Sequence, residues 1–228
     1  MKQDTKNKTQ GTQNGANKHT KNSNDRTAGQ NGEAKTKNQE KNQEDSYLEK
    51  FFISQLQDIY YAEKKIADGL KVMQQACTTD ELRDAFLEHG IQTQKHIKRL
   101  EKVFDSLDKK PEGKKCEAIE GILKEAESII GETEQGSMTR DAALIFAAQK
   151  VEHYEIATYG GLVQFAITLG LHEEADVLDR TLREEEYTDS LLTEIAENDV
   201  NLAAEQEGVH YSWEKNNEPE EVENENKK

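Results

Sequence analysis

Apolar residues recur at alternating steps of three and four along the middle of the chain, a spacing that places them on one face of a long α-helix. This pattern predicts four helices, at about residues 46–76, 82–107, 137–169 and 173–200. Between the second and third helices, apolar residues from Ile119 to Ile130 predict a short connecting helix on the outside. A connection this long lets those two helices run parallel, as in a four-helix bundle with a crossover.

Two local signals mark helix ends. Thr78 and Glu81 have the spacing of a capping box, which predicts that Thr78 caps the second helix. Gly170 follows the last apolar position of the third helix and is a natural left-handed stop. The first two helices and the last two are therefore predicted to form two hairpins.

Each predicted helix carries ionisable side chains on its apolar face near mid-helix. In chain order these are Glu63; His89 and His96; Glu152 and Glu155; and Glu185 and Asp189. An ionised carboxylate taken out of water without a partner costs on the order of several kcal/mol. These acids therefore need a metal ion, a bound cation or protonated partners.

The positions of these residues along the two hairpins also match. Glu63 and Thr93 lie equally far from the turn near residue 78, and Glu155 and Asp189 lie equally far from the turn near residue 172. Because an α-helix rises by a fixed amount per residue, the polar groups of all four helices are predicted to meet in one layer.

A layer of carboxylates and imidazoles has the ligand chemistry of a two-metal site in a four-helix bundle, and it suits iron or manganese. The alternative is a buried network in which the acids pair with His89, His96 and His153 or with lysines. Tyr60, Tyr61, Tyr154 and Tyr159 lie within a turn of the layer. Each phenol either packs in the core or donates a hydrogen bond to a ligand carboxylate.

Composition narrows the class of protein. The 228 residues carry a formal net charge of −16, which disfavours a nucleic-acid partner. No apolar run is long enough to span a membrane, and no signal-peptide core follows Met1, so we expect a cytoplasmic protein. Cys77 and Cys116 lack the spacing of a zinc site or a disulfide framework.

Both ends of the chain differ from the middle. Residues 1–45 are almost entirely polar and are predicted to form a disordered extension. Residues 206–228 are rich in glutamate and are predicted to form an acidic tail. The folded domain is thus predicted to span residues 46–205.

Three stretches resemble a known family: Gln57–Lys64, Asp141–Gly160 and Thr181–Glu186. They closely resemble the bacterial YciF-type proteins, a ferritin-like family. The resemblance implies an all-α, ferritin-like four-helix bundle that is usually dimeric, has a two-metal centre and is associated with bacterial stress responses. We therefore expect a homodimer that binds metal ions.

The resemblance also implies a ligand set. Carried over by position, it comprises Glu63, His89, Glu152, Glu155, Glu185 and Asp189. On the second helix the family pattern has a glutamate where this chain has Gln92, whose neutral amide is a weaker ligand, and His96 is a candidate to compensate. His153 is expected to point off the apolar face, in a supporting or surface role.

Two functions follow from these expectations. The first is a metal protein of the stress response with peroxide, oxygen or metal-handling chemistry. The second is a non-catalytic oligomerising bundle whose metal site is degenerate or empty. No positioned nucleophile, cofactor loop or phosphate cradle is present in the sequence, so enzymatic activity stays open.

Overall fold

The computed structural model describes residues 46–216, with side chains as far as residue 208. The predicted disordered extension (1–45) and the end of the predicted acidic tail (217–228) lie outside the described residues. The helices are α1 (Tyr47–Ala76), α2 (Asp80–Ser106), α3 (Glu117–Glu132), α4 (Met138–Leu169), α5 (His172–Ile195), a π-helical turn (Ala196–Val200) and α6 (Asn201–Asn216).

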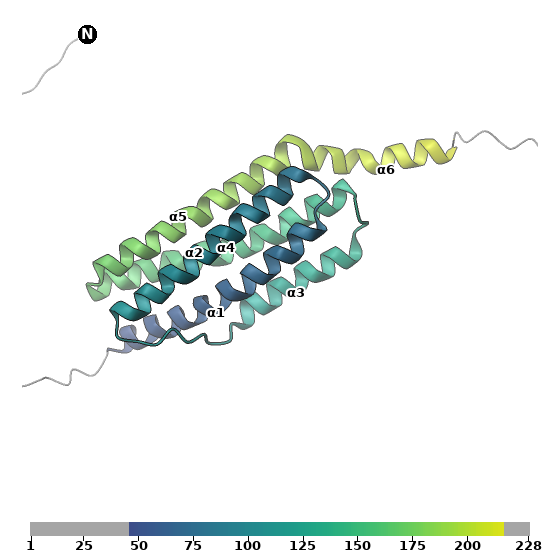
Figure 1. Cartoon of the computed structure of the whole chain (residues 1–228). Coiled ribbons are helices and arrows are strands. Elements are labelled where there is room, and N and C mark those ends of the chain that lie inside the picture. The colour runs from purple at the N-terminus through teal and green to yellow at the C-terminus, as the bar shows by residue number, and fades with distance from the viewer. Residues whose placement is uncertain (1–45, 217–228) are drawn as a thin grey trace, which may run out of the picture. The chain divides into compact units, whose positions relative to one another are not determined.

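Four of these helices form the bundle (Figure 1). α1 and α2 make one hairpin, α4 and α5 make the other, and the hairpins pack with α1 against α4 and α2 against α5. The connecting helix α3 lies outside, against α4 and α1. The predicted all-α, ferritin-like bundle with a crossover helix is confirmed.

Asp141, at the start of α4, ties the two hairpins together. Its Oδ1 accepts from the Thr78 amide at 2.7 Å, and its Oδ2 accepts from the Thr79 amide and hydroxyl at 2.8 and 2.7 Å. The beginnings of α2 and α4 therefore lie side by side. This contact establishes that the two helices run parallel, as the long connection predicts.

The helix ends follow local chemistry, with one correction. Ser46 and Ser137 cap α1 and α4 through their hydroxyls, each accepting from a backbone amide at 3.1 Å. The cap of α2 is Thr79, so the prediction of Thr78 is wrong by one residue. Thr78 instead donates its hydroxyl hydrogen bond to the Ser137 carbonyl at 2.7 Å. Gly170 has φ 77° and ends α4, as predicted.

The helical backbone continues beyond the predicted fourth helix. The domain boundary predicted at residue 205 lies inside α6. Glu207 on α6 accepts hydrogen bonds from the amides of Met138 and Thr139, which are free at the start of α4. Its carboxylate therefore holds α6 against the N-terminal end of α4.

Apolar layers enclose the middle of the bundle. On α1, Ile59 and Ile66 are buried one turn before and after Glu63, and on α4 Ala148 and Leu162 are buried on either side of the polar positions. The polar layer thus lies inside the bundle, away from its ends.

Among residues 46–216, no helix combines the length and hydropathy that crossing a lipid bilayer requires.

Candidate metal centre

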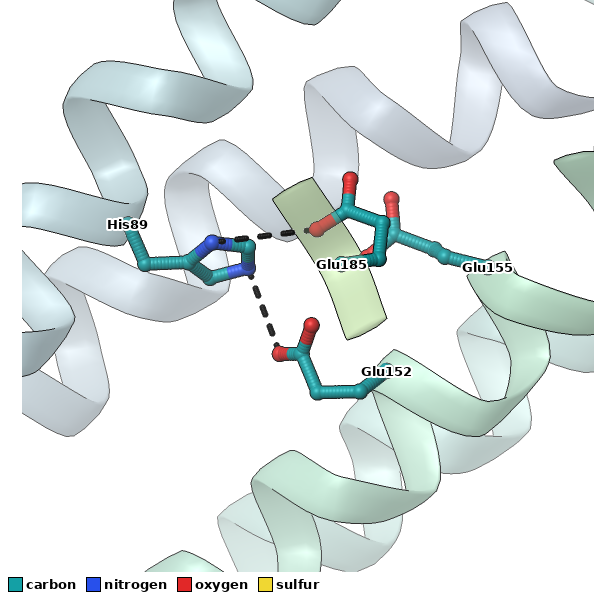
Figure 2. Close-up of side chains that lie close together, drawn as sticks. All are labelled: His89, Glu152, Glu155 and Glu185. Atoms are coloured by element: carbon teal, nitrogen blue, oxygen red, sulfur yellow. Dashed lines mark ion pairs between the residues drawn. The ribbon is translucent and has the colours of Figure 1, made fainter. Parts of the chain in front are cut away.

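Six ionisable side chains from four helices converge inside the bundle. They are Glu63 on α1, His89 and His96 on α2, Glu152 and Glu155 on α4, and Glu185 on α5. None has more than 3% of its surface exposed. Figure 2 shows four of them, His89, Glu152, Glu155 and Glu185, facing one another. The predicted polar layer therefore exists.

These side chains form two overlapping groups. His89, Glu152, Glu155 and Glu185 make the first group, which we call the His89 group, and Glu63, His96 and Glu185 make the second, the His96 group. Within each group, one potential ligand atom from every residue lies within 4.8 Å of the others. Because Glu185 belongs to both, its two oxygens can serve both positions, as a bridging carboxylate does.

The contacts inside the groups are short but poorly directed for hydrogen bonding. His96 Nδ1 lies 2.8 Å from Glu185 Oε1, and His89 Nε2 lies 3.2 Å from Glu152 Oε1. Even so, His96 Nδ1 and His89 Nε2 have no hydrogen-bond partner with acceptable geometry. These two nitrogens therefore lie at ion-pair distances from the carboxylates without making hydrogen bonds to them.

The same feature distinguishes the whole cluster. Among the described residues, eight buried side-chain nitrogen and oxygen atoms lack a hydrogen-bond partner, and all eight belong to these six residues. Both oxygens of Glu155 and both of Glu185 are among them. A folded protein rarely leaves buried polar atoms unpaired, so these donor sets fit a metal ion.

Burial and mutual repulsion shift the pKa values of the carboxyl groups. Burial raises the pKa of Glu155 well above its usual value, and the neighbouring carboxylates of Glu185, Glu63 and Glu152 raise it further. Burial also raises the pKa of Glu185, and the two histidines oppose this, leaving it at about 7. Protons therefore take the place of cations when no metal is bound.

The histidines shift in the direction that retains those protons. Burial by itself lowers the pKa of His89, but the Glu152 and Glu185 carboxylates outweigh burial and raise it to about 9. The pKa of His96 is likewise lowered by burial and raised more strongly by Glu185 and Glu63, to about 10. Both rings are thus imidazolium ions at neutral pH in the metal-free protein.

These shifts predict that the metal-free protein loses stability as pH rises. The folded state keeps protons that the unfolded state releases near pH 4.5 from Glu185 and near pH 6.5 from the histidines. Stability falls with pH wherever the folded state binds more protons. We expect a fall of more than about 1 kcal/mol per pH unit between pH 7 and 9. Urea unfolding with a chelator present measures it, and a flat or rising profile contradicts it.

Tyr159 joins the cluster through a hydrogen bond. Its hydroxyl donates to Glu63 Oε1, and its ring is fully buried. For Tyr159, hydrogen bonding to a carboxylate of the layer is therefore confirmed. Tyr60, Tyr61 and Tyr154 donate instead to Glu101, Glu120 and Asp58, which lie outside both groups.

Asp189 of the predicted ligand set and the weaker candidate Gln92 lie outside both groups. Gln92 is half-buried on α2, and Asp189 accepts from Gln149 Nε2 at 3.3 Å and lies 3.3 Å from His153 Nε2. His153 is 71% exposed, in keeping with the surface role expected for it. In the structure, α2 supplies His96 as its second donor, one heptad after His89. His96 was the candidate expected to compensate for Gln92, and its seven-residue spacing from His89 places both histidines on one face of α2.

Known proteins resemble this chain over the whole four-helix bundle. Residues 47–205 match the sequence profile of a family described as a domain of unknown function (DUF892). Protein YciF of Escherichia coli (strain K12) is 44% identical to this chain over 159 residues, covering 69% of this chain and 95% of that protein.

Solved structures of other proteins also resemble this chain over the bundle. A crystal structure of the E. coli stress protein YciF matches with a TM-score of 0.65 at 42% identity, covering 69% of this chain and 99% of that one. YcfI of Rhodopseudomonas palustris, described as a candidate structural protein, matches with a TM-score of 0.63 at 38% identity, covering 67% of this chain and 96% of that one. The residues matched by the family profile include all six side chains of the cluster.

Proposed function

Since this chain belongs to the family described as a domain of unknown function (DUF892), we propose that it is a ferritin-like protein of the bacterial stress response that binds two iron or manganese ions. One observation carries the proposal: every buried side-chain nitrogen or oxygen that lacks a hydrogen-bond partner among the described residues lies in the six-residue cluster. Such atoms are costly in a metal-free core and are satisfied by cations.

The donor inventory supports two ions. Two-metal carboxylate bundles use four glutamates and two histidines, and the cluster contains the same number of each. Their distribution differs, because both histidines come from α2 and α4 supplies two glutamates three residues apart. Carboxylate and imidazole together suit iron and manganese.

The residues of the chain define what such a centre is able to do. Iron or manganese, when bound, supplies reversible electron transfer to peroxide or oxygen. Glu185 spans both groups and would keep the two ions close. Tyr159 fixes the orientation of Glu63 through its hydroxyl, and the apolar layers around the cluster exclude bulk water. This arrangement supports chemistry on a small oxidant or on the metal itself.

The descriptions of the relatives support a role in the stress response and also an alternative, non-catalytic function. The E. coli relative is described as a stress protein, which is consistent with chemistry on oxidants. The R. palustris relative is described as a candidate structural protein, which favours a non-catalytic bundle acting through oligomerisation. Such a bundle would have apolar surface for contacts with another copy, because the side chains of Leu87 and Ile91 on α2 and of Tyr187 on α5 are exposed. A homodimer is compatible with both functions.

Elemental analysis of the purified protein tests the proposal. We expect about two iron or manganese ions per chain in the wild type, because the cluster holds the donors of a two-metal site. The Glu155→Ala variant should lose at least one of them. Glu186→Ala removes an exposed glutamate of α5 and serves as the matched control, which should retain both.

Other outcomes separate the two functions. A single ion per chain in the wild type means that only one of the two groups binds. A wild type free of metal after growth in metal-replete medium, which takes up none on titration, contradicts the proposal. That result favours the structural bundle, with the acids kept neutral by protons.

A further inference from the structure

The two histidines of the cluster are supported by different partners on α5. His96 Nε2 lies 2.8 Å from Glu184 Oε2, whereas His89 Nδ1 lies 3.3 Å from the Thr188 hydroxyl. In His96 the remaining nitrogen, Nδ1, faces the cluster at 2.8 Å from Glu185 Oε1. In His89 both nitrogens lie near the cluster, because Nε2 is 3.2 Å from Glu152 Oε1 and Nδ1 is 3.9 Å from Glu185 Oε2. The shortest contact with the cluster is thus made by Nδ1 in His96 and by Nε2 in His89, and the groups that support the other nitrogens differ: a carboxylate for His96 and a hydroxyl for His89.

The partner of His96 is itself held in place by Arg99. Both terminal nitrogens of Arg99 donate hydrogen bonds to the Glu184 carboxylate, each at 2.7 Å. One of them also donates to Thr181 Oγ1 at 3.2 Å. A bidentate pair with a permanently charged guanidinium fixes both the position and the negative charge of a carboxylate. An ionised carboxylate only accepts hydrogen bonds, so the hydrogen shared with His96 is carried by Nε2.

We propose that Arg99 and Glu184 are positioning residues that hold His96 with Nδ1 toward Glu63 and Glu185, and thereby make the two metal positions unequal. The inference rests on the proposed function for its consequence, metal affinity. It goes beyond that function in assigning roles to two residues that contact no metal position themselves. It also predicts which of the two positions depends on them.

The difference between the two supports gives the direction of the effect. A carboxylate that accepts from the outer nitrogen of a ligating histidine orients the ring and raises its basicity. Thr188 is neutral, and because its hydroxyl donates to the Glu184 carbonyl at 3.0 Å, its oxygen is left to accept from His89 Nδ1. The imidazole of the His96 group is therefore supported by a carboxylate and that of the His89 group by a hydroxyl, so only the His96 group should depend on Arg99 and Glu184.

The pair is also suitable for mutation. Arg99 and Glu184 are 17% and 29% exposed, in contrast to the fully buried His96 that they hold. Their substitution changes the support of the ring and leaves the apolar layers intact. A loss of metal affinity in such a variant is therefore separable from a loss of fold.

Anaerobic titration with Co²⁺, followed by visible absorption, tests the inference. Wild type should bind two ions, and Glu184→Gln should lose about 10- to 100-fold in affinity at one position, with a changed absorption band for that ion only. Arg99→Met should shift the same position in the same direction. Glu186→Gln removes an equal charge from the exposed face of α5 and should match the wild type.

Two outcomes overturn the inference: unchanged binding in Glu184→Gln, or equal weakening at both positions. Nitrogen-detected NMR of the metal-free protein gives a second readout that needs no metal. The wild type should show a slowly exchanging His96 Nε2 proton, which becomes faster exchanging in Glu184→Gln. If wild type binds no Co²⁺, the proposed function fails. The positioning role then stands if this exchange rate changes and falls if it does not.

Discussion

Replacing Glu155 by methionine is expected to have opposite effects on stability with and without metal. In the metal-free protein the variant should be more stable than wild type by about 2 kcal/mol, because a well-packed apolar side chain avoids the cost of burying a carboxyl group whose oxygens lack hydrogen-bond partners. Both Glu155 oxygens lack a hydrogen-bond partner, and the carboxyl is surrounded by three other acids. Methionine has a similar length and no polar atom to leave unpaired.

With iron or manganese in excess, the order should reverse. Wild type gains about 4 kcal/mol when free metal is about a thousand times its dissociation constant, and the variant lacks a ligand that this binding requires. Denaturant unfolding with and without a chelator measures both effects. Glu186→Met, an exposed substitution on α5, should change stability little in either condition. Destabilisation by Glu155→Met in the chelator contradicts the prediction.

Asp141 is expected to be the most sensitive acidic residue outside the cluster. Its fully buried carboxylate accepts three hydrogen bonds from the turn between α1 and α2. Asp141→Ala should lower the free energy of unfolding by about 3 kcal/mol, because it leaves two backbone amides and a hydroxyl without their charged acceptor. Unlike substitutions in the cluster, its effect should be the same with metal and with chelator.

Chemical denaturation also checks this prediction. Asp141→Asn keeps the shape and one acceptor oxygen, so it should lose less than Asp141→Ala. Asp84→Ala, an exposed acid on α2, is the matched control and should change stability by less than about 0.5 kcal/mol. If Asp141→Ala is as stable as this control, the contact does not join the two hairpins in solution.

The cluster explains why stability and metal affinity are coupled in this protein. Four carboxylates in one buried layer repel one another. In the metal-free protein, protons on His89, His96 and Glu155 reduce this repulsion. Metal ligation requires that the imidazoles give up their cluster-facing protons. Raising the pH therefore weakens the metal-free fold and strengthens metal binding.

Some of this could be read from the sequence because it depends on local periodicity. The three-and-four spacing predicted the four long helices and the outer helix, and Gly170 marked the end of α4 because a left-handed residue favours glycine. Glu63, Glu152, Glu155 and Glu185 stood out because helical spacing places each of them on a face that is otherwise apolar. A fixed rise per residue was enough to predict that they share one layer.

Tertiary structure alone decided which polar groups meet. Asp189 lies one turn from Glu185, and only the rotation of α5 against α4 turns it toward Gln149 and His153 and away from the cluster. Likewise, the packing of α2 against α5 places His96 between Glu184 and Glu185. Helical periodicity identifies which residues lie on one face of a helix, but only to within about one position along the sequence. The angles and depths at which helices pack choose among neighbouring polar side chains on that face.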